Sequence, residues 1–231
     1  MTLTLLDLLL PGICAGCGAP GTPLCRTCST TLARPRRHAP RPAPPGLPPL
    51  WTAATYAGAA RAAVLAYKER GRRDLAPALG TALGSAAWRA AGRGRAVWLV
   101  PVPSRRSVAR ARGGDHVLRL ARVAAGHLGR HGLSAEAHPA LGMAGRPRDS
   151  VGLGARERAV NLSGAFRVTT QRAGPPGAVL VLVDDVATTG STLSEAARTL
   201  SAAGLPVVGA AVVAATPRMV PARRSPRTWS P

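Results

Sequence analysis

Hydrophobic and polar positions along the chain follow two repeating patterns from residue 51 onward. The first consists of short apolar runs bounded by glycine, proline or charged residues. Runs of this length predict strands, and uninterrupted ones predict strands that are buried on both faces. The runs occur at residues 51–58, 96–102, 179–183 and 206–214, and GAFRV at 164–168 predicts a shorter strand.

The second pattern has apolar residues at helical spacing. It predicts helices at residues 59–71, 74–91, 115–131 and 191–203. Asp115 is a suitable N-cap for the third, the first ends at Gly71, and Gly204 follows the last. One apolar face of the third helix contains Val117, Leu118, Ala121, Ala124, Ala125 and Leu128. Strands that alternate with helices predict an α/β fold, a parallel sheet flanked by helices.

Four cysteines, all of those in the chain, lie between residues 14 and 28 in the pattern C-x2-C, seven residues, C-x2-C. Two such pairs present four thiolates to one centre, a donor set that selects zinc in tetrahedral geometry. A closed four-cysteine site predicts a structural zinc finger without an open catalytic position. Free structural thiols are the alternative, and disulfides fit a reducing cytoplasm poorly. The predicted ligands are Cys14, Cys17, Cys25 and Cys28.

Composition divides the chain further. The cysteine-containing head is followed by a Pro- and Arg-rich segment without periodicity, which predicts a stiff linker, and the chain ends in a basic tail predicted to be disordered. The polar, glycine-rich stretch at 142–162 predicts a mobile functional loop. The predicted division is residues 1–33 for the head, 34–50 for the linker, 51–216 for the main domain and 217–231 for the tail.

No stretch of the sequence approaches the roughly 20 apolar residues that span a bilayer, so no membrane insertion is expected. The opening MTLTLLDLLLPG lacks the basic start of a secretory signal, which predicts a cytoplasmic location. The formal charge of +21 favours polyanionic partners. All basic residues except Lys68 are arginine, however, and a GC-rich genome is an alternative source of this charge.

Asp184 and Asp185 follow the most hydrophobic run and precede a turn of small hydroxyl residues. Because ligands of parallel sheets bind at the carboxyl ends of strands, this is a candidate site. Backbone N–H groups and hydroxyls at the start of a helix cradle phosphate, and two carboxylates accept hydrogen bonds from vicinal ribose hydroxyls. The inferred ligand is a ribose 5-phosphate. The alternatives are an ordinary turn and cap, or the acidic pair of a phosphotransfer receiver.

The stretch VLVLVDDVATTGSTL closely resembles the signature that binds phosphoribosyl diphosphate (PRPP) in type I phosphoribosyltransferases. A four-cysteine head, a Tyr-Lys segment, VPVPSRR, ARGGDH and RERAVNLSGAF extend a resemblance to the ComF family along most of the chain. That family is phosphoribosyltransferase-like and connected with natural competence. The resemblance therefore implies a type I phosphoribosyltransferase-like fold, and it adds single-stranded DNA or DNA-uptake proteins to the candidate partners.

The resemblance assigns roles by position. The loop after the strand at 96–102 would approach the pyrophosphate, the two aspartates would hold the ribose and assist a magnesium ion that the diphosphate carries, and the hydroxyl turn would hold the 5-phosphate. Asp184 and Asp185 are thereby the candidate catalytic residues. The candidate PRPP-binding residues are Val102, Pro103, Ser104, Arg105, Asp184, Asp185, Ala187, Thr188, Thr189, Gly190, Ser191 and Thr192. Zinc in the head and magnesium with the ligand are the implied cofactors.

Some positions depart from the family pattern. Arg112-Gly113-Gly114-Asp115-His116 stands where the family often has RGFNQ, and the T-x-x-Q of the mobile loop is missing. Arg158, Asn161 and Phe166 match the block that follows that loop. We expect His116 to pack or to be solvated, and we expect Lys68 on a helix surface unless it points into the site. No residue of the sequence is predicted to act as a general base.

Three functions remain open at this stage. An enzyme would transfer the phosphoribosyl group of PRPP to an unknown acceptor, stabilising the leaving diphosphate electrostatically. Candidates for contact with the diphosphate are Arg105, Arg106, Arg146, Arg148, Arg156 and Arg158. A non-catalytic protein would keep the pocket as a nucleotide sensor in DNA uptake. A nucleic-acid-binding protein would use the basic surface, with salt-dependent and sequence-independent affinity.

Overall fold

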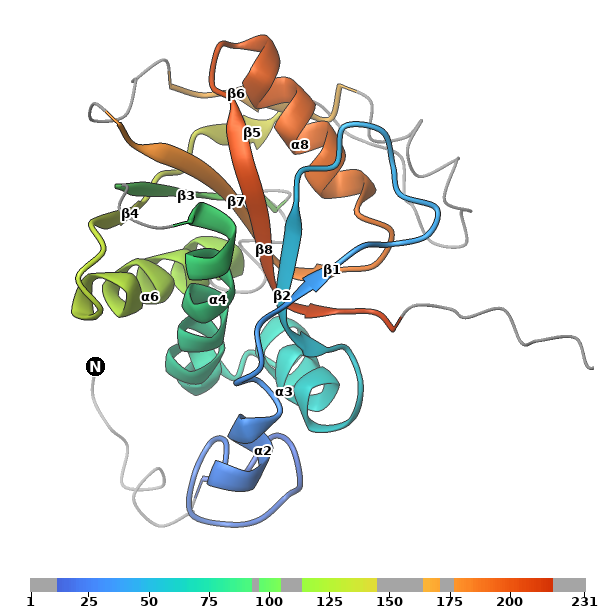
Figure 1. Cartoon of the computed structure of the whole chain (residues 1–231). Helices are drawn as coiled ribbons and strands as arrows, with labels where there is room; N and C mark the ends of the chain where they lie inside the picture. The colour runs from blue at the N-terminus through green and yellow to red at the C-terminus, as the bar shows by residue number, and fades with distance from the viewer. Residues whose placement is uncertain (1–11, 93–95, 105–113, 145–163, 171–176, 218–231) are drawn as a thin grey trace, which may run out of the picture.

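A computed structural model of the chain describes residues 12–92, 96–104, 114–144, 164–170 and 177–217. Within these residues the sheet and helices form one layered body, with the four-cysteine head at one end (Figure 1). Three expectations from the sequence lie outside the described residues: Arg105 and the other arginines proposed for the diphosphate, nearly all of the loop at 142–162, and the basic tail.

A six-stranded sheet forms the centre of the fold, with strand order β1-β2-β8-β7-β3-β4. Its neighbouring strands are parallel, except that β1 runs antiparallel to β2 at one edge. A separate antiparallel pair consists of β5 and β6. The strands are β1 (Arg36–His38), β2 (Leu50–Thr55), β3 (Val97–Pro101), β4 (Ala135–Ala137), β5 (Leu141–Met143), β6 (Phe166–Val168), β7 (Val179–Ala187) and β8 (Val207–Ala215).

Strand β7 shows how the sequence builds a core on each face of the sheet. Its side chains alternate between the two faces, and all of them from Val179 to Val183 are buried. Val179, Val181 and Val183 pack into one hydrophobic cluster, and Leu180 and Leu182 pack into the other. A continuous apolar run is therefore the pattern that a central parallel strand requires.

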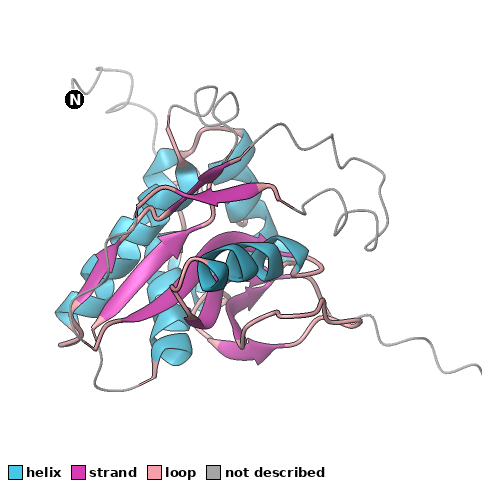
Figure 2. Ribbon diagram, turned by 90° about the horizontal axis from the view of Figure 1, so that it is seen from above, coloured by secondary structure: helices cyan, strands magenta, loops and turns pink. Residues whose placement is uncertain are grey.

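Helices cover both faces unequally. The first cluster contains residues of α3 (Gly58–Glu69), α4 (Ala76–Ala91) and α6 (His116–Arg130), and the second contains residues of α8 (Ser191–Ala202) and of the β5–β6 pair. Seen from above, the helices lie on either side of the strands (Figure 2). A 3-10 turn at Arg73–Leu75 precedes α4, and a short helix α2 (Arg26–Thr30) lies in the head.

The predicted fold class is confirmed: the protein is α/β, with a mostly parallel sheet flanked by helices and a four-cysteine cluster near its N-terminus. The structure differs at several elements. Strand β7 continues through both aspartates to Ala187, instead of ending at residue 183. The elements α2, β1, β4 and β5 were not predicted. Among the described residues, none of the helices combines the length and apolar character needed to cross a bilayer.

Candidate functional site

The four cysteines of the head converge on one point. Their sulfur atoms all lie within 4.8 Å of one another, and all four are free thiols. The Sγ atoms of Cys17 and Cys25 are 3.7 Å apart. Sulfurs about 2.3 Å from a tetrahedral zinc ion are separated by roughly 3.8 Å, so this spacing fits a shared ion. The cluster is compatible with a structural zinc site.

Local backbone contacts preorganise these thiols. The N–H of Cys25 donates to Cys14 Sγ at 3.3 Å, and this bond, with further backbone hydrogen bonds from Cys17 and Gly16, lowers the pKa of Cys14 to about 6 against the effect of burial. Burial raises the pKa of Cys28 to about 12. Gly16 must be a glycine, because a Cβ atom there would lie 2.6 Å from Cys28 Sγ. The chain therefore packs closely around the thiols. A divalent ion bound between them would stabilise several of them in the deprotonated, thiolate form.

A second site lies at the carboxyl ends of the central strands. A cavity of about 400 Å³ opens there, within the range typical of small-molecule sites. It collects residues from β7, α3 and α6, from the segments that follow β2 and β3, and from the turn and first residues of α8. Its lining consists of Tyr56, Lys68, Val102, Pro103, Ser104, His116, Val117, Asp184, Asp185, Val186, Thr188 and Thr192.

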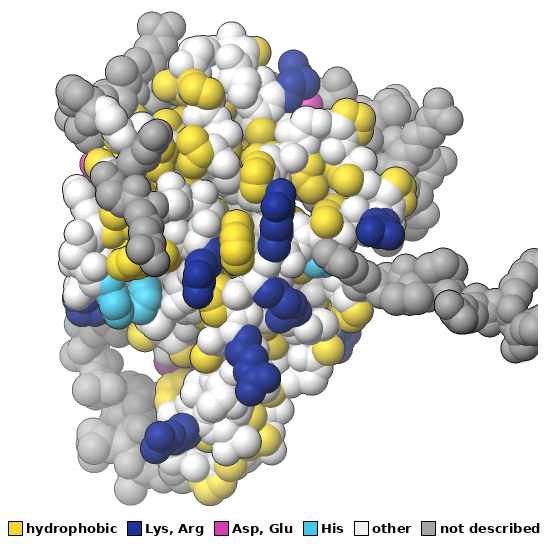
Figure 3. Space-filling view, in the orientation of Figure 1, with side chains coloured by type: hydrophobic (Ala, Val, Ile, Leu, Met, Phe, Trp, Pro, Cys, Tyr) yellow, Lys and Arg dark blue, Asp and Glu magenta, His cyan; other side chains and the backbone are white. Residues whose placement is uncertain are grey.

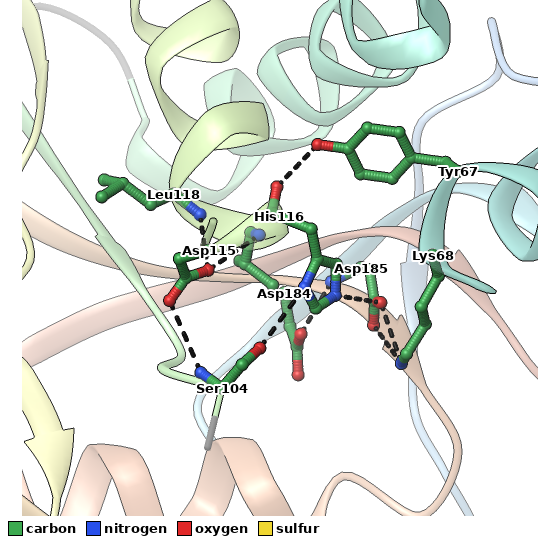
Figure 4. Close-up of polar contacts among 9 residues, drawn as sticks. Tyr67, Lys68, Ser104, Asp115, His116, Leu118, Asp184 and Asp185 are labelled. Carbon is green, nitrogen blue, oxygen red and sulfur yellow. Dashed lines mark hydrogen bonds and ion pairs between the residues drawn. The ribbon is translucent and has the colours of Figure 1, made fainter. Parts of the chain in front are cut away.

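Asp185 points into a polar network and is 3 % exposed (Figure 4). Lys68 Nζ forms an ion pair with its Oδ2 at 2.9 Å, and His116 Nε2 lies 2.8 Å from the same atom. Burial by itself raises the pKa of this carboxyl, but the His116 hydrogen bond and the Lys68 charge outweigh it and hold the pKa below its usual range. Asp185 is therefore a stable carboxylate whose partners belong to the protein.

Asp184, its neighbour, has a different environment. It is half-buried, lines the cavity, and accepts the backbone N–H of Asp185 at 2.8 Å. Burial and the negative charge of Asp185 raise its pKa well above its usual value. A carboxyl in this state gains from any ligand that brings hydrogen-bond donors or positive charge. The two aspartates that the sequence presents as a pair thus have separate surroundings.

Ser104 and the start of α6 complete the network (Figure 4). Ser104 Oγ lies 3.3 Å from His116 Nδ1, and the Ser104 N–H donates to Asp115 Oδ2 at 3.5 Å. Asp115 also caps α6, because its Oδ1 accepts the N–H groups of Val117 and Leu118. The predicted N-cap is confirmed. The Tyr67 hydroxyl donates to the His116 carbonyl oxygen at 2.8 Å and fixes the first turn of the helix.

The hydroxyl turn joins β7 to α8, as the sequence predicts. Gly190 has a φ of +82°, a left-handed conformation that favours glycine. Thr188 and Thr192 line the cavity. Ser191 is buried, and its Oγ lies 3.0 Å from the Thr189 hydroxyl. The hydroxyl residues that face the cavity are thus two threonines next to the N-terminus of α8.

Seven of the predicted site residues meet at this cavity: Val102, Pro103, Ser104, Asp184, Asp185, Thr188 and Thr192. Ala187 at the end of β7, Thr189 and Gly190 in the turn, and Ser191 at the start of α8 do not line it, and Arg105 lies outside the described residues. The ligand roles of all these residues stay predictions.

The default expectation for Lys68 was wrong, because this lysine pairs with Asp185 inside the site. His116 is packed, as expected, but it also bonds the acidic pair. Tyr56 lines the cavity and was missed. The one available signal was that Lys68 is the single lysine in an arginine-rich chain.

Comparison with known families agrees with this geometry. A model of the phosphoribosyl transferase domain matches residues 148–227, about a third of the chain. The match contains β7 with its two aspartates, the hydroxyl turn, α8 and β8. No curated protein sequence matches the chain. The C-terminal part of the protein is thus similar to a phosphoribosyl transferase domain, which supports a ligand of the PRPP class.

Proposed function

We propose that the protein binds PRPP, as its magnesium complex, in the cavity at the carboxyl end of β7, and transfers the phosphoribosyl group to an unidentified acceptor. One observation carries the proposal: Asp184 and the threonines at the start of α8, which lie in the region similar to a phosphoribosyl transferase domain, line a single cavity together with Ser104. Their chemistry suits the three parts of PRPP, which are a sugar with vicinal hydroxyls, a phosphate and a diphosphate.

Each group has a task in this reaction. Asp184 accepts hydrogen bonds from ribose hydroxyls, while Thr188, Thr192 and the amides of the first turn of α8 hold the 5-phosphate. Lys68, which has 30 % of its side chain exposed, brings positive charge to the wall of the cavity. A magnesium ion bound with the diphosphate supplies further charge to the leaving group, and the oxygen donors of Asp184 and Ser104 are of the type it prefers. The protein then stabilises developing charge electrostatically.

The four-cysteine head has a structural task in this proposal. The spacing of the thiols suits zinc, and four protein ligands leave no position for a substrate. The head also contacts the main domain, because the Arg72 guanidinium donates to the Ile13 carbonyl oxygen at 3.1 Å and Leu32 packs into the first core cluster. Zinc therefore holds a small unit against α3 and α4.

Titration calorimetry with PRPP and Mg²⁺ tests the binding step. The substitution Asp184→Asn removes the charge while it keeps the shape, and we expect affinity to fall about tenfold or more, since hydrogen bonds to charged groups contribute about 1.5–3 kcal/mol. The matched control is Asp74→Asn, because Asp74 pairs with Arg72 outside the cavity. Equal affinity of wild type and Asp184→Asn, or no binding of PRPP at all, contradicts the proposal.

Pyrophosphate release separates an enzyme from a sensor. Because the sequence resembles the ComF family, we extend the proposal to a role in DNA uptake. The alternative to a transferase in that role is a non-catalytic protein that senses the nucleotide. An enzyme releases pyrophosphate from PRPP when one acceptor of a panel of nucleobases and amines is added. A sensor binds PRPP with the same dependence on Asp184 and releases none.

Nucleic-acid binding is a second candidate, favoured by the surface. Basic side chains extend over the face that carries the head, β1 and α4, and few acidic side chains appear there (Figure 3). Exposed arginines in this part of the sequence include Arg26, Arg34, Arg36 and Arg37. Binding through such a surface weakens steeply with salt and is independent of sequence. An affinity for single-stranded DNA that is unchanged between 50 and about 200 mM salt contradicts this candidate.

A further inference from the structure

Asp185, His116 and Ser104 form a chain of hydrogen bonds that ends at the cavity. The three residues come from β7, from the first residue of α6 and from the segment after β3, and they are far apart in the sequence. His116 is 4 % exposed and bridges the other two through its two ring nitrogens (Figure 4). Ser104, which is half-buried, is the member of the chain whose side chain is best placed to meet a ligand.

The direction of these bonds follows from the chemistry of the partners. Asp185 accepts hydrogen bonds from Lys68 Nζ, so it is a carboxylate that has no hydrogen to donate. His116 Nε2 must therefore carry the hydrogen of the bond to Asp185. In neutral imidazole the other nitrogen, Nδ1, is then an acceptor, and Ser104 is the group that donates to it.

We propose that Asp185 and His116 make Ser104 a hydrogen-bond acceptor for the bound ligand. The hydrogen of Ser104 Oγ is committed to His116, so the oxygen presents lone pairs to the cavity. Such an oxygen repels the bare oxygens of a phosphate and takes a hydrogen from a donor. Two parts of the ligand offer donors: a ribose hydroxyl, and a water molecule on the magnesium ion that accompanies the diphosphate. His116 is a positioning residue in this arrangement, since it acts through Ser104.

The inference rests on the proposed function for the identity of the ligand, while its geometry rests on Asp115 and His116 at the start of α6. Asp115 accepts the Ser104 N–H, while His116 accepts the Ser104 hydroxyl. Adjacent residues at the start of α6 thus hold both the backbone and the side chain of Ser104.

Two simple ligands distinguish the two donors in calorimetry. Ribose 5-phosphate without metal offers sugar hydroxyls, whereas pyrophosphate with Mg²⁺ offers metal-bound water. We expect Ser104→Ala and His116→Leu to weaken the same one of these ligands, by about two- to tenfold, which is the net effect of one hydrogen bond. The other ligand keeps its affinity. The double variant should bind that ligand no more weakly than the single variant with the lower affinity, because both substitutions remove the same interaction.

His116→Gln and His127→Leu are the matched variants. Glutamine keeps one donor and one acceptor, so His116→Gln retains most of the affinity that His116→Leu loses, which a purely steric role of the ring does not explain. His127 lies on the same helix outside the cavity, and His127→Leu leaves both affinities unchanged. The inference is overturned if the two substitutions affect different ligands, if they weaken both ligands alike, if their effects multiply, or if neither has an effect.

Nitrogen NMR of histidine-labelled protein tests the hydrogen-bond directions without any ligand. The His116 signals, assigned from their loss in His116→Gln, should show the hydrogen on Nε2 and a bare Nδ1. A ring with its hydrogen on Nδ1, or on both nitrogens at neutral pH, overturns the inference even if the proposed function stands. Wild-type protein that binds neither ribose 5-phosphate nor Mg-pyrophosphate refutes the proposed function, and the ligand contact of Ser104 with it.

Discussion

The four-cysteine head and the cavity at the end of β7 are assembled from opposite kinds of sequence information. The four thiols of the head come from 15 consecutive residues, CAGCGAPGTPLCRTC, and they converge through contacts within that stretch. The cavity joins Asp185 to Lys68 and His116, which lie 117 and 69 residues away in the sequence. One site is local, and the other exists only when the whole sheet has formed.

This difference determines what each site depends on. A head of this size buries too little apolar surface to fold by itself, and an ion bound to all four thiols would supply its stability. The cavity has its polar groups held by β7, α3, α6 and the segment after β3, and these elements pack around two hydrophobic clusters. We therefore expect perturbations of the head to remain local and perturbations of the buried network to spread through the domain.

Removal of the metal should have the largest effect. With a strong chelator, or in Cys28→Ser, we expect hydrogen exchange at residues 12–33 to accelerate at least a hundredfold, since structural zinc contributes about 10–16 kcal/mol to small metal-dependent folds. Residues 179–202 should change by less than about tenfold. Exchange mass spectrometry measures both regions, elemental analysis counts the zinc, and Ser29→Ala is the control. Equal acceleration of both regions would show that the head is part of the scaffold.

Asp185→Asn should destabilise the whole domain. The substitution leaves Lys68 and His116 facing a neutral group, and the loss of one partner in a buried pair costs about 3–5 kcal/mol. Because 30 % of the Lys68 side chain is exposed and can hydrate, we expect about 2–3 kcal/mol. The midpoint of denaturant unfolding gives this value. Asp74→Asn, at the exposed pair with Arg72, should lower the stability by less than about 1 kcal/mol. Similar effects of the two substitutions would contradict the central role of Asp185.

Gly190→Ala should lower stability by about 1–2 kcal/mol, because a left-handed conformation is strained for alanine. The new Cβ would also lie 3.1 Å from a methyl group of Leu47 and 3.4 Å from Pro40. Gly129 on α6 provides the control, since a Cβ there meets nothing within 4 Å and alanine favours a helix. Thermal unfolding compares the two variants. Should Gly190→Ala be as stable as Gly129→Ala, the turn is less constrained than its φ indicates.

These contrasts explain how far the sequence could be interpreted. Periodicity located the central strands and the main helices, because each buries a face of regular spacing. The cysteine spacing located the cluster, and the acidic pair located the cavity, because both motifs are contiguous. The end of β7 was placed too early, since charged residues usually mark the end of a strand, whereas here Lys68 and His116 satisfy Asp185 within the sheet.

Other parts of the structure left no signal in a single sequence. Strand β1 lies in a Pro- and Arg-rich segment without alternation, and its pairing with β2 supplies the order that its composition lacks. Lys68 and His116 each occupy an ordinary helical position, and their function follows from a partner on a distant strand. Long-range contacts of this kind depend on topology, which local patterns do not encode.

Asp184→Asn tests the contrast between the two aspartates of the cavity. It should have the smallest effect on stability of the changes considered, and in the opposite direction to Asp185→Asn. The folded-state pKa of Asp184 is raised by burial and by Asp185, so its charged form is disfavoured in the fold. Its contribution to stability is present below the unfolded pKa of about 3.9 and is lost as the pH rises through the folded pKa. Asparagine resembles the protonated acid, so the variant should be more stable than wild type at pH 8.

The pH dependence separates this explanation from a simple change in packing. The advantage of Asp184→Asn should shrink as the pH falls through the folded pKa of Asp184 and vanish below the unfolded one. The pH dependence for Asp185 has the opposite sign. Because the folded-state pKa of Asp185 is lowered, its charged form stabilises the fold above the pKa of the unfolded chain, and this stability is lost as the pH falls through the folded-state pKa. Urea unfolding of both variants from pH 4 to pH 8 shows this. The explanation is contradicted if the difference in unfolding free energy between Asp184→Asn and wild type does not depend on pH, or if wild type is the more stable at pH 8. Asp184 would then have its stabilising partners within the protein and would not need a ligand to supply them.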